Sequence, residues 1–168
     1  MRLTTHTDYA LRLLMLLALE PDRLHTIEEV ATRYRVSRNH LMKVVLTLVG
    51  AGLVESLRGR GGGLQLAKPA AAISVGEVVR ATEDSFALVE CFERESNTCM
   101  VSPCCTLKGA LHEAMAAFLR VLDQRSLAQL CESPARNKRF RDLLAEIPVV
   151  VEPVKPARGR RRSAAPPA

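Results

Sequence analysis

The chain has 168 residues, 48% of them hydrophobic and 4% aromatic, which predicts a single domain with tails and an aliphatic, mainly helical core. Its net charge of +6 says little about a nucleic-acid partner, because the acid-free segment Pro153–Ala168 alone contributes +5. No apolar run reaches the ~20 residues that span a bilayer, and Asp8 and Arg12 interrupt the apolar N-terminal stretch, so we expect a cytoplasmic protein with no membrane segment and no export signal.

Residues 1–82 carry the pattern of a winged helix-turn-helix DNA-binding domain, in the order helix, helix, turn, helix, hairpin. Three helix starts are marked by capping residues, namely Thr7, the capping box Thr26–Glu29 and Ser37. The third helix runs from Arg38 to about Val49, and Gly50 and Gly52 end it. A strand, Leu53–Leu57, follows. The glycine-rich turn Arg58–Gly63 joins it to its partner strand, Leu64–Ala67.

The predicted DNA contacts lie at the start of the third helix and in the hairpin turn. The first residues of a recognition helix meet the base edges, and here these are Ser37, Arg38, Asn39, His40 and, one turn on, Lys43. On the glycine-rich wing, Arg58 and Arg60 are expected to enter a groove or contact phosphates. Seven basic residues lie between Arg33 and Lys68 against one acid. Any one charged face is usually only solvated, but the ordered combination of caps, basic turn and wing favours DNA binding.

Three cysteines, Cys91, Cys99 and Cys105, lie in the predicted loop 83–106, separated by seven and five residues. Thiolates are preferred ligands of iron–sulfur clusters and soft metals. These gaps are wide for zinc, which usually recruits a close CxxC pair, so residue chemistry favours a cluster but leaves zinc open. Cys104 and Cys105 are expected in the first turn of the next helix, where only one of the two can face a metal. Cys131, far along that helix, is expected to be structural.

The longest periodic segment predicts one helix from about Pro103 to Leu130, ~40 Å long at 1.5 Å per residue. Half of its face would be bare in a monomer, so we expect a homodimer joined by this helix. The predicted organisation is therefore a cysteine-rich cluster-binding loop (83–106), a dimerisation helix with a C-terminal helical segment (107–147) and a disordered basic tail (148–168).

Several stretches within about residues 1–130 carry a family resemblance: L-T-T-H-T-D-Y-A-L-R, V-S-R-N-H-L-M-K-V-V, R-G-R-G-G-G-L-Q-L-A-K-P, I-S-V-G-E-V-V-R and C-x7-C-x5-C-T-L-K-G-A-L. With them the sequence resembles the nitric-oxide-sensing repressors in the bacterial superfamily of winged-helix iron–sulfur regulators. The resemblance implies a homodimeric repressor of a double-stranded DNA operator, with nitric oxide as effector.

The same resemblance implies one iron–sulfur cluster per subunit, with four irons favoured and two irons possible, held by Cys91, Cys99 and Cys105. It also implies that Asp8 contributes a ligand across the dimer interface. Taken alone, Asp8 is an ordinary acid in the first turn of a helix. Cys104 departs from the family pattern, in which a small apolar residue is usual.

Two alternatives remain at the level of sequence. Sister regulators of cluster biosynthesis and iron supply share the fold and carry three similarly spaced cysteines. A cluster-bearing redox protein is the other possibility, but no dinucleotide glycine fingerprint follows a predicted strand, and no catalytic Ser/His/Asp set is evident. The four histidines, His6, His25, His40 and His112, are scattered. We therefore expect a regulator and not an enzyme.

Overall fold

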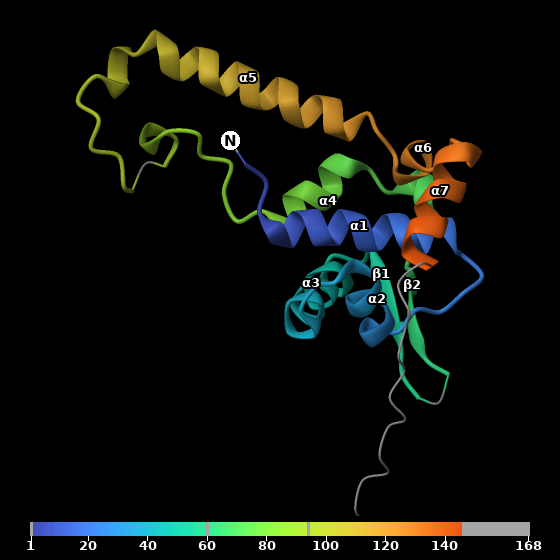
Figure 1. Cartoon of the computed structure of the whole chain (residues 1–168). Helices are drawn as coiled ribbons and strands as arrows, with labels where there is room; N and C mark the ends of the chain where they lie inside the picture. The colour runs from blue at the N-terminus through green and yellow to red at the C-terminus, as the bar shows by residue number, and fades with distance from the viewer. Residues whose placement is uncertain (1, 60, 94, 146–168) are drawn as a thin grey trace, which may run out of the picture.

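The computed structural model describes residues 2–59, 61–93 and 95–145 (Figure 1). Its elements, in chain order, are α1 Thr5–Leu19, α2 Ile27–Tyr34, α3 Arg38–Gly50, β1 Val54–Leu57, β2 Gly63–Leu66, η1 Ala70–Ala72, α4 Val75–Thr82, η2 Glu90–Phe92, η3 Ser102–Cys104, α5 Thr106–Asp123, α6 Leu127–Leu130 and α7 Pro134–Ala145. This mainly helical arrangement with one small hairpin confirms the predicted fold class. The predicted tail 148–168 lies outside the described residues.

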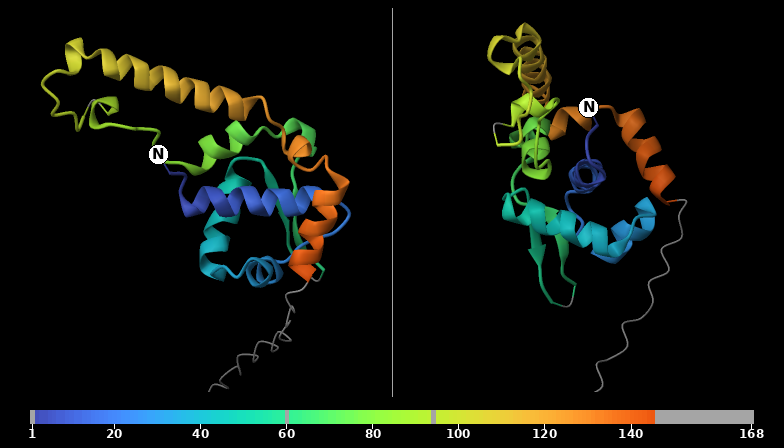
Figure 2. Two further views of the ribbon diagram at one scale, coloured as in Figure 1. Left: turned by 45° about the horizontal axis from the view of Figure 1, so that its top comes forward. Right: turned by 90° about the vertical axis from the view of Figure 1, so that its left-hand side faces the viewer.

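Helix α1 lies at the centre of the molecule and contacts α3, α4, α6 and β2. It is buried on most of its circumference, because Ala10, Leu13, Leu14, Leu16 and Leu17 all belong to the core. Viewed along α1, in the right-hand panel of Figure 2, the hairpin lies at one end of the molecule and α5 with its preceding loop lies at the other. The predicted DNA reader and the cysteine-rich loop are therefore on opposite sides of α1.

The hairpin forms the wing. β1 and β2 pair antiparallel, from Val54 opposite Leu66 to Leu57 opposite Gly63, and Val54 and Leu64 are buried against the helices. The turn has positive φ at Gly59 (106°) and Gly61 (83°), a conformation that side chains with a Cβ rarely adopt. The wing therefore depends on glycine for its shape.

The start of α1 differs from the prediction. The N-cap is Thr4 and not Thr7, because Thr4 has extended φ and ψ (−67°, 158°) and its side chain accepts a hydrogen bond from the Thr7 amide. Thr7 is fully buried, and its hydroxyl lies 2.8 Å from that of Thr82 at the end of α4. The predicted cap of α2 is confirmed, because the Thr26 side chain accepts from the third amide of the helix, and Ser74 caps α4 in the same way.

The prediction of one long helix from Pro103 to Leu130 was also wrong, because the helix ends at Asp123. Ser126 has extended backbone angles and forms a reciprocal capping box with Gln129, which starts α6 as a separate helix. The amide of Leu127 donates to the carbonyl of Ile73, and its side chain is 1% exposed in the core. At the other end, Cys105 is the N-cap of α5 and Cys104 lies in the preceding 3-10 turn, so neither is in the first turn of the helix.

Candidate functional site

The N-terminus of α3 presents polar side chains to solvent. Ser37 is the N-cap, as predicted, but its side chain makes no capping hydrogen bond within the described part of the chain. Arg38 is exposed and its Nε lies 2.9 Å from Oε2 of Glu28 on α2. Asn39 and, one turn later, Lys43 are exposed. The buried face of α3 consists of Leu41, Val44, Val45 and Leu48, as predicted.

His40 lies differently from its neighbours, because its ring faces α1. The centroid of its ring is 5.0 Å from that of Tyr9 and 6.1 Å from that of His6. His6 in turn places Nε2 3.1 Å from the Thr47 hydroxyl. Burial, followed by the nearby His40, lowers the pKa of His6. The His40 side chain thus helps to join α1 to α3, and a base contact from it stays a prediction.

On the wing, Arg58 is exposed, while Arg60 lies outside the described residues. Besides Arg38, which pairs with Glu28, two further members of the basic block between Arg33 and Lys68 have intramolecular partners. Arg33 Nη2 lies 2.9 Å from Glu29 Oε1. Lys68 Nζ lies 2.7 Å from Glu77 Oε1. The charge available to phosphates is therefore smaller than the sequence count indicates.

His25 joins the wing to the helices, a role that its place in the sequence did not indicate. Its main chain pairs with Leu64 of β2 in both directions, with N–O distances of 3.2 and 2.8 Å. Its side chain is fully buried, with Nε2 3.5 Å from Glu20 Oε2 and Nδ1 3.6 Å from Glu29 Oε1. Burial lowers the pKa of His25, although the two carboxylates oppose this shift.

Four of the five cysteines lie on the long connection between α4 and α5, whose described residues form only the 3-10 turns η2 and η3. Cys91 is 8% exposed within η2, Cys99 and Cys105 are partly exposed, and Cys104 is exposed. None of the five cysteines, all of which are described, forms a disulfide. Cys131 ends α6, where burial raises its pKa, and α6 lies at the opposite end of the molecule from the loop (Figure 1).

The structure does not gather the predicted ligands around one point. Among the described residues, no group of three or more His, Cys, Asp or Glu side chains could hold an ion. Two polar contacts order part of the loop: the Thr98 hydroxyl donates to Glu90 (3.0 Å), and the Cys99 amide donates to the Asn97 side chain (3.0 Å). In chemistry the donor set fits an iron–sulfur cluster, since four unpaired thiols, including those of Cys91, Cys99 and Cys105, share one loop.

Asp8, the predicted ligand for a partner subunit, is held by its own helix. Arg12 contacts both carboxylate oxygens, at 2.9 Å through Nε and 2.7 Å through Nη2. Both side chains are about half exposed.

Glu83 is a residue that the sequence analysis did not single out. It follows α4 at the first position of the connection, and its Oε1 accepts from the Thr4 amide (2.7 Å), the Thr4 hydroxyl (3.0 Å) and the Thr7 hydroxyl (2.5 Å). Burial alone would raise the pKa of Glu83, but these hydrogen bonds outweigh burial and lower it. The cysteine-rich connection therefore begins at a carboxylate that caps α1.

A sequence model of the Rrf2 family, described as an iron-dependent transcriptional regulator, matches residues 3–133. The chain belongs to the Rrf2 family. It is 53% identical over 131 residues to the HTH-type transcriptional regulator NsrR of Halalkalibacterium halodurans, a match that covers 77% of this chain and 90% of the relative. Its identity to NsrR of Bacillus subtilis is 49% over 134 residues, covering 79% and 92%.

Among solved structures, the chain is similar to CymR, the global cysteine regulator of B. subtilis. The TM-score is 0.64 at 26% identity, and the match covers 79% of this chain and 97% of CymR. Together with the winged helix-turn-helix order of α2, α3 and the hairpin, the family match confirms that the Rrf2 chain is a DNA-binding transcriptional regulator. Every helix within the described residues is too short or too polar to cross a membrane.

Proposed function

We propose that this Rrf2 protein is a nitric-oxide-responsive repressor. As a homodimer it binds operator DNA while it holds an iron–sulfur cluster, and it releases the operator when the cluster is nitrosylated or lost. The observation that carries the proposal is the link at Glu83, where the cysteine-rich connection caps α1, the helix against which α3 packs. A change in the loop can thereby reach the recognition helix through one element. The NsrR relatives support the choice of effector.

Cys91, Cys99 and Cys105 would hold the cluster, which supplies thiolate-bound iron that nitric oxide can attack. A four-iron cluster is the favoured form. Asp8 would complete the ligand set of the other subunit. To do so its carboxylate must leave Arg12, and this costs little, because a half-exposed ion pair at i,i+4 spacing contributes only about 0.3–0.5 kcal/mol.

The homodimer would be formed by α5. Of its eighteen residues only Met115 is buried, while Leu107 is 62% and Val121 56% exposed. Such a bare, partly apolar helix fits a two-fold interface with a second copy. A dimer would present two α3 helices to half-sites about one duplex turn apart, roughly 34 Å.

On DNA, Asn39 and Arg38 would contact base edges, and Lys43 and Arg58 would contact phosphates. Ser37 would support the backbone contacts at the start of α3, and Arg60 on the wing would act like Arg58. Arg38 is exposed beside Glu28, so it can exchange that partner for a base at little cost.

Operator binding by cluster-loaded, cluster-free and nitric-oxide-treated protein tests the proposal. We expect tight binding only by the loaded dimer, and we expect alanine in place of Cys91, Cys99 or Cys105 to abolish iron and sulfide retention. Alanine in place of Cys131 is the matched control, because that thiol lies at the other end of the fold. Equal affinity of all three forms would refute the switch. Release by iron depletion but not by nitric oxide would favour a regulator of iron supply.

A further inference from the structure

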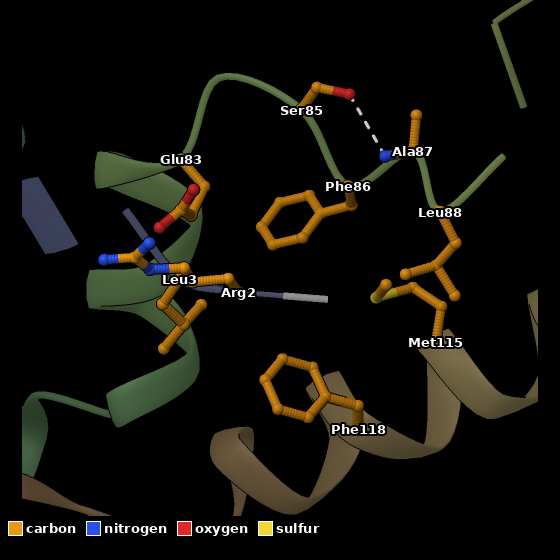
Figure 3. A pocket seen from close by; sticks show the side chains of 9 residues that line it. All are labelled: Arg2, Leu3, Glu83, Ser85, Phe86, Ala87, Leu88, Met115 and Phe118. Atoms are coloured by element: carbon orange, nitrogen blue, oxygen red, sulfur yellow. Dashed lines mark hydrogen bonds between the residues drawn. The ribbon is translucent and has the colours of Figure 1, made fainter. Parts of the chain in front are cut away.

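The connection that carries the cysteines lies along α5. Phe86 and Leu88 of the connection and Met115 and Phe118 of α5 line one pocket and point into it (Figure 3). At this pocket the connection first runs beside the helix after leaving α4.

Further along, the ring of Phe92 stacks on the ring of His112 from α5. The two ring centroids are 3.9 Å apart and the planes differ by 5°, so the rings are in face-to-face contact. Beyond this stack, Lys108 of α5 places Nζ 3.4 Å from the Ser102 hydroxyl.

These contacts follow a simple order on the helix. Lys108, His112 and Met115 are spaced by four and three residues, so they share one face of α5. Their partners in the connection occur in the reverse order along the chain. The connection is thus laid antiparallel on this face, and its cysteines are brought toward the end of α5 where Cys105 is the N-cap.

The middle contact bears directly on a proposed ligand. Phe92 follows Cys91 in the single 3-10 turn η2, and Cys91 is the only one of the loop cysteines counted as buried in the described chain. His112 is otherwise exposed, so its stack with Phe92 is a surface contact that holds this turn against the helix.

We propose that His112 is a positioning residue that seats Cys91 on α5 through Phe92 and so presents this thiol to the cluster. The proposal rests on the proposed function for the cluster, but the seating of Cys91 does not. It assigns His112 a role through the face of its ring, so another aromatic ring at this position should replace it.

The test is alkylation of the full-length, reduced, metal-free chain with iodoacetamide, followed at each cysteine by peptide mass spectrometry. His112→Ala should make Cys91 react roughly three- to tenfold faster, equivalent to ~0.6–1.4 kcal/mol at tenfold per 1.4 kcal/mol. His112→Phe should restore the slow rate, and Phe92→Leu should give the fast rate from the other side of the stack. Cys104, which is exposed already, should react at the same rate in every variant.

Glu113→Ala, which changes an exposed neighbour of His112 on α5, should leave Cys91 protected. In cluster-loaded protein, His112→Ala should speed iron loss to a chelator, and His112→Phe should reverse this. An unchanged Cys91 rate in both His112→Ala and Phe92→Leu, or no rescue by His112→Phe, would overturn the proposal. If the wild-type chain binds no iron and sulfide although Cys91 responds as expected, the proposed function fails and the seating role of His112 stands.

Discussion

Removal of the Glu83 carboxylate should release Thr4, the N-cap of α1, and Thr7 from their shared acceptor and destabilise the fold by about 1.5–3 kcal/mol. Of its three hydrogen bonds, the two from Thr4 are exposed, so water can replace them at little cost. The bond from Thr7 is partly buried, and a hydrogen bond to a charged group contributes about 1.5–3 kcal/mol. Thr7 would keep its contact with Thr82, which limits the loss, while the negative charge at the helix N-terminus adds about 0.3–1 kcal/mol.

The effect should depend on pH with a definite sign. The pKa of Glu83 is lower in the folded chain than its ordinary value near 4.5, so the unfolded chain takes up a proton first as the pH falls. The stabilisation is therefore fully present above that ordinary value and is lost as the pH falls through the folded-state pKa. Urea unfolding of wild-type and Glu83→Ala protein, at pH ~7 and at pH ~3.5, measures this difference directly.

Two variants sharpen the assay. Glu83→Gln keeps the shape and one acceptor oxygen, so it isolates the charge and should show the smaller loss. Glu113→Ala removes an exposed carboxylate from α5 and should stay within about 0.5 kcal/mol of the wild type. If Glu83→Ala unfolds at the wild-type urea midpoint at neutral pH, or if the difference persists unchanged in acid, the capping argument is refuted.

Gly76→Ala should destabilise the chain by about 1–3 kcal/mol in urea unfolding. The new Cβ would overlap the Asp123 carboxylate and lie 2.9 Å from the Asp123 backbone nitrogen. Wild-type stability of this variant would contradict the close approach of α4 to the end of α5. Asn39→Ala should cost ~1–3 kcal/mol of operator binding and relax the base preference, whereas Arg58→Ala should weaken all DNA alike and reduce the salt slope by about one, as anisotropy titrations can measure; equal losses on random DNA would count against a base contact by Asn39. Burial lowers the pKa of His25, so the unfolded chain is protonated first below the ordinary value of 6.5, and urea midpoints should fall as the pH decreases from there; a flat profile would exclude a neutral buried His25.

The features that could be predicted from sequence are those set by residues close together in the chain. The caps of α2 and α4 follow from Thr26 and Ser74 with an acid three residues later, and the buried face of α3 follows from its periodicity. The wing followed likewise from two short strands around a glycine-rich turn. Each of these signals spans a few residues, so no tertiary contact is needed to read it.

The errors arose where distant contacts decide the outcome. Thr4 and not Thr7 caps α1, because the Thr7 hydroxyl is buried against Thr82, which is 75 residues away in the sequence. The break between α5 and α6 was missed because Leu122 and Leu130 keep a two-turn spacing across it, although the Leu127 amide donates to the Ile73 carbonyl and both side chains belong to the core. Here a local signal was available, since Ser126 and Gln129 form a capping box.

The candidate site shows the same division. The position of the predicted recognition residues at the start of α3 followed from the turn that precedes them. The ion-pair partners of Arg33 and Lys68 could not be predicted from the basic block. Glu20 and Glu29 precede the basic block Arg33–Lys68, and Glu77 follows it. The stack of His40 on Tyr9 likewise joins residues that are distant in sequence. Charge counts within one window therefore overstate the number of cations that face solvent.

The position of Leu127 has a consequence for co-translational folding. This residue, 1% exposed, shares one core with Leu13 and Leu14 of α1, more than a hundred residues earlier. A nascent chain that ends before α6 lacks the contacts between α6 and α1, and contacts of such long sequence separation form slowly. We therefore expect the winged helix to reach its final packing only after most of the chain has been translated, with its apolar surface available to chaperones until then.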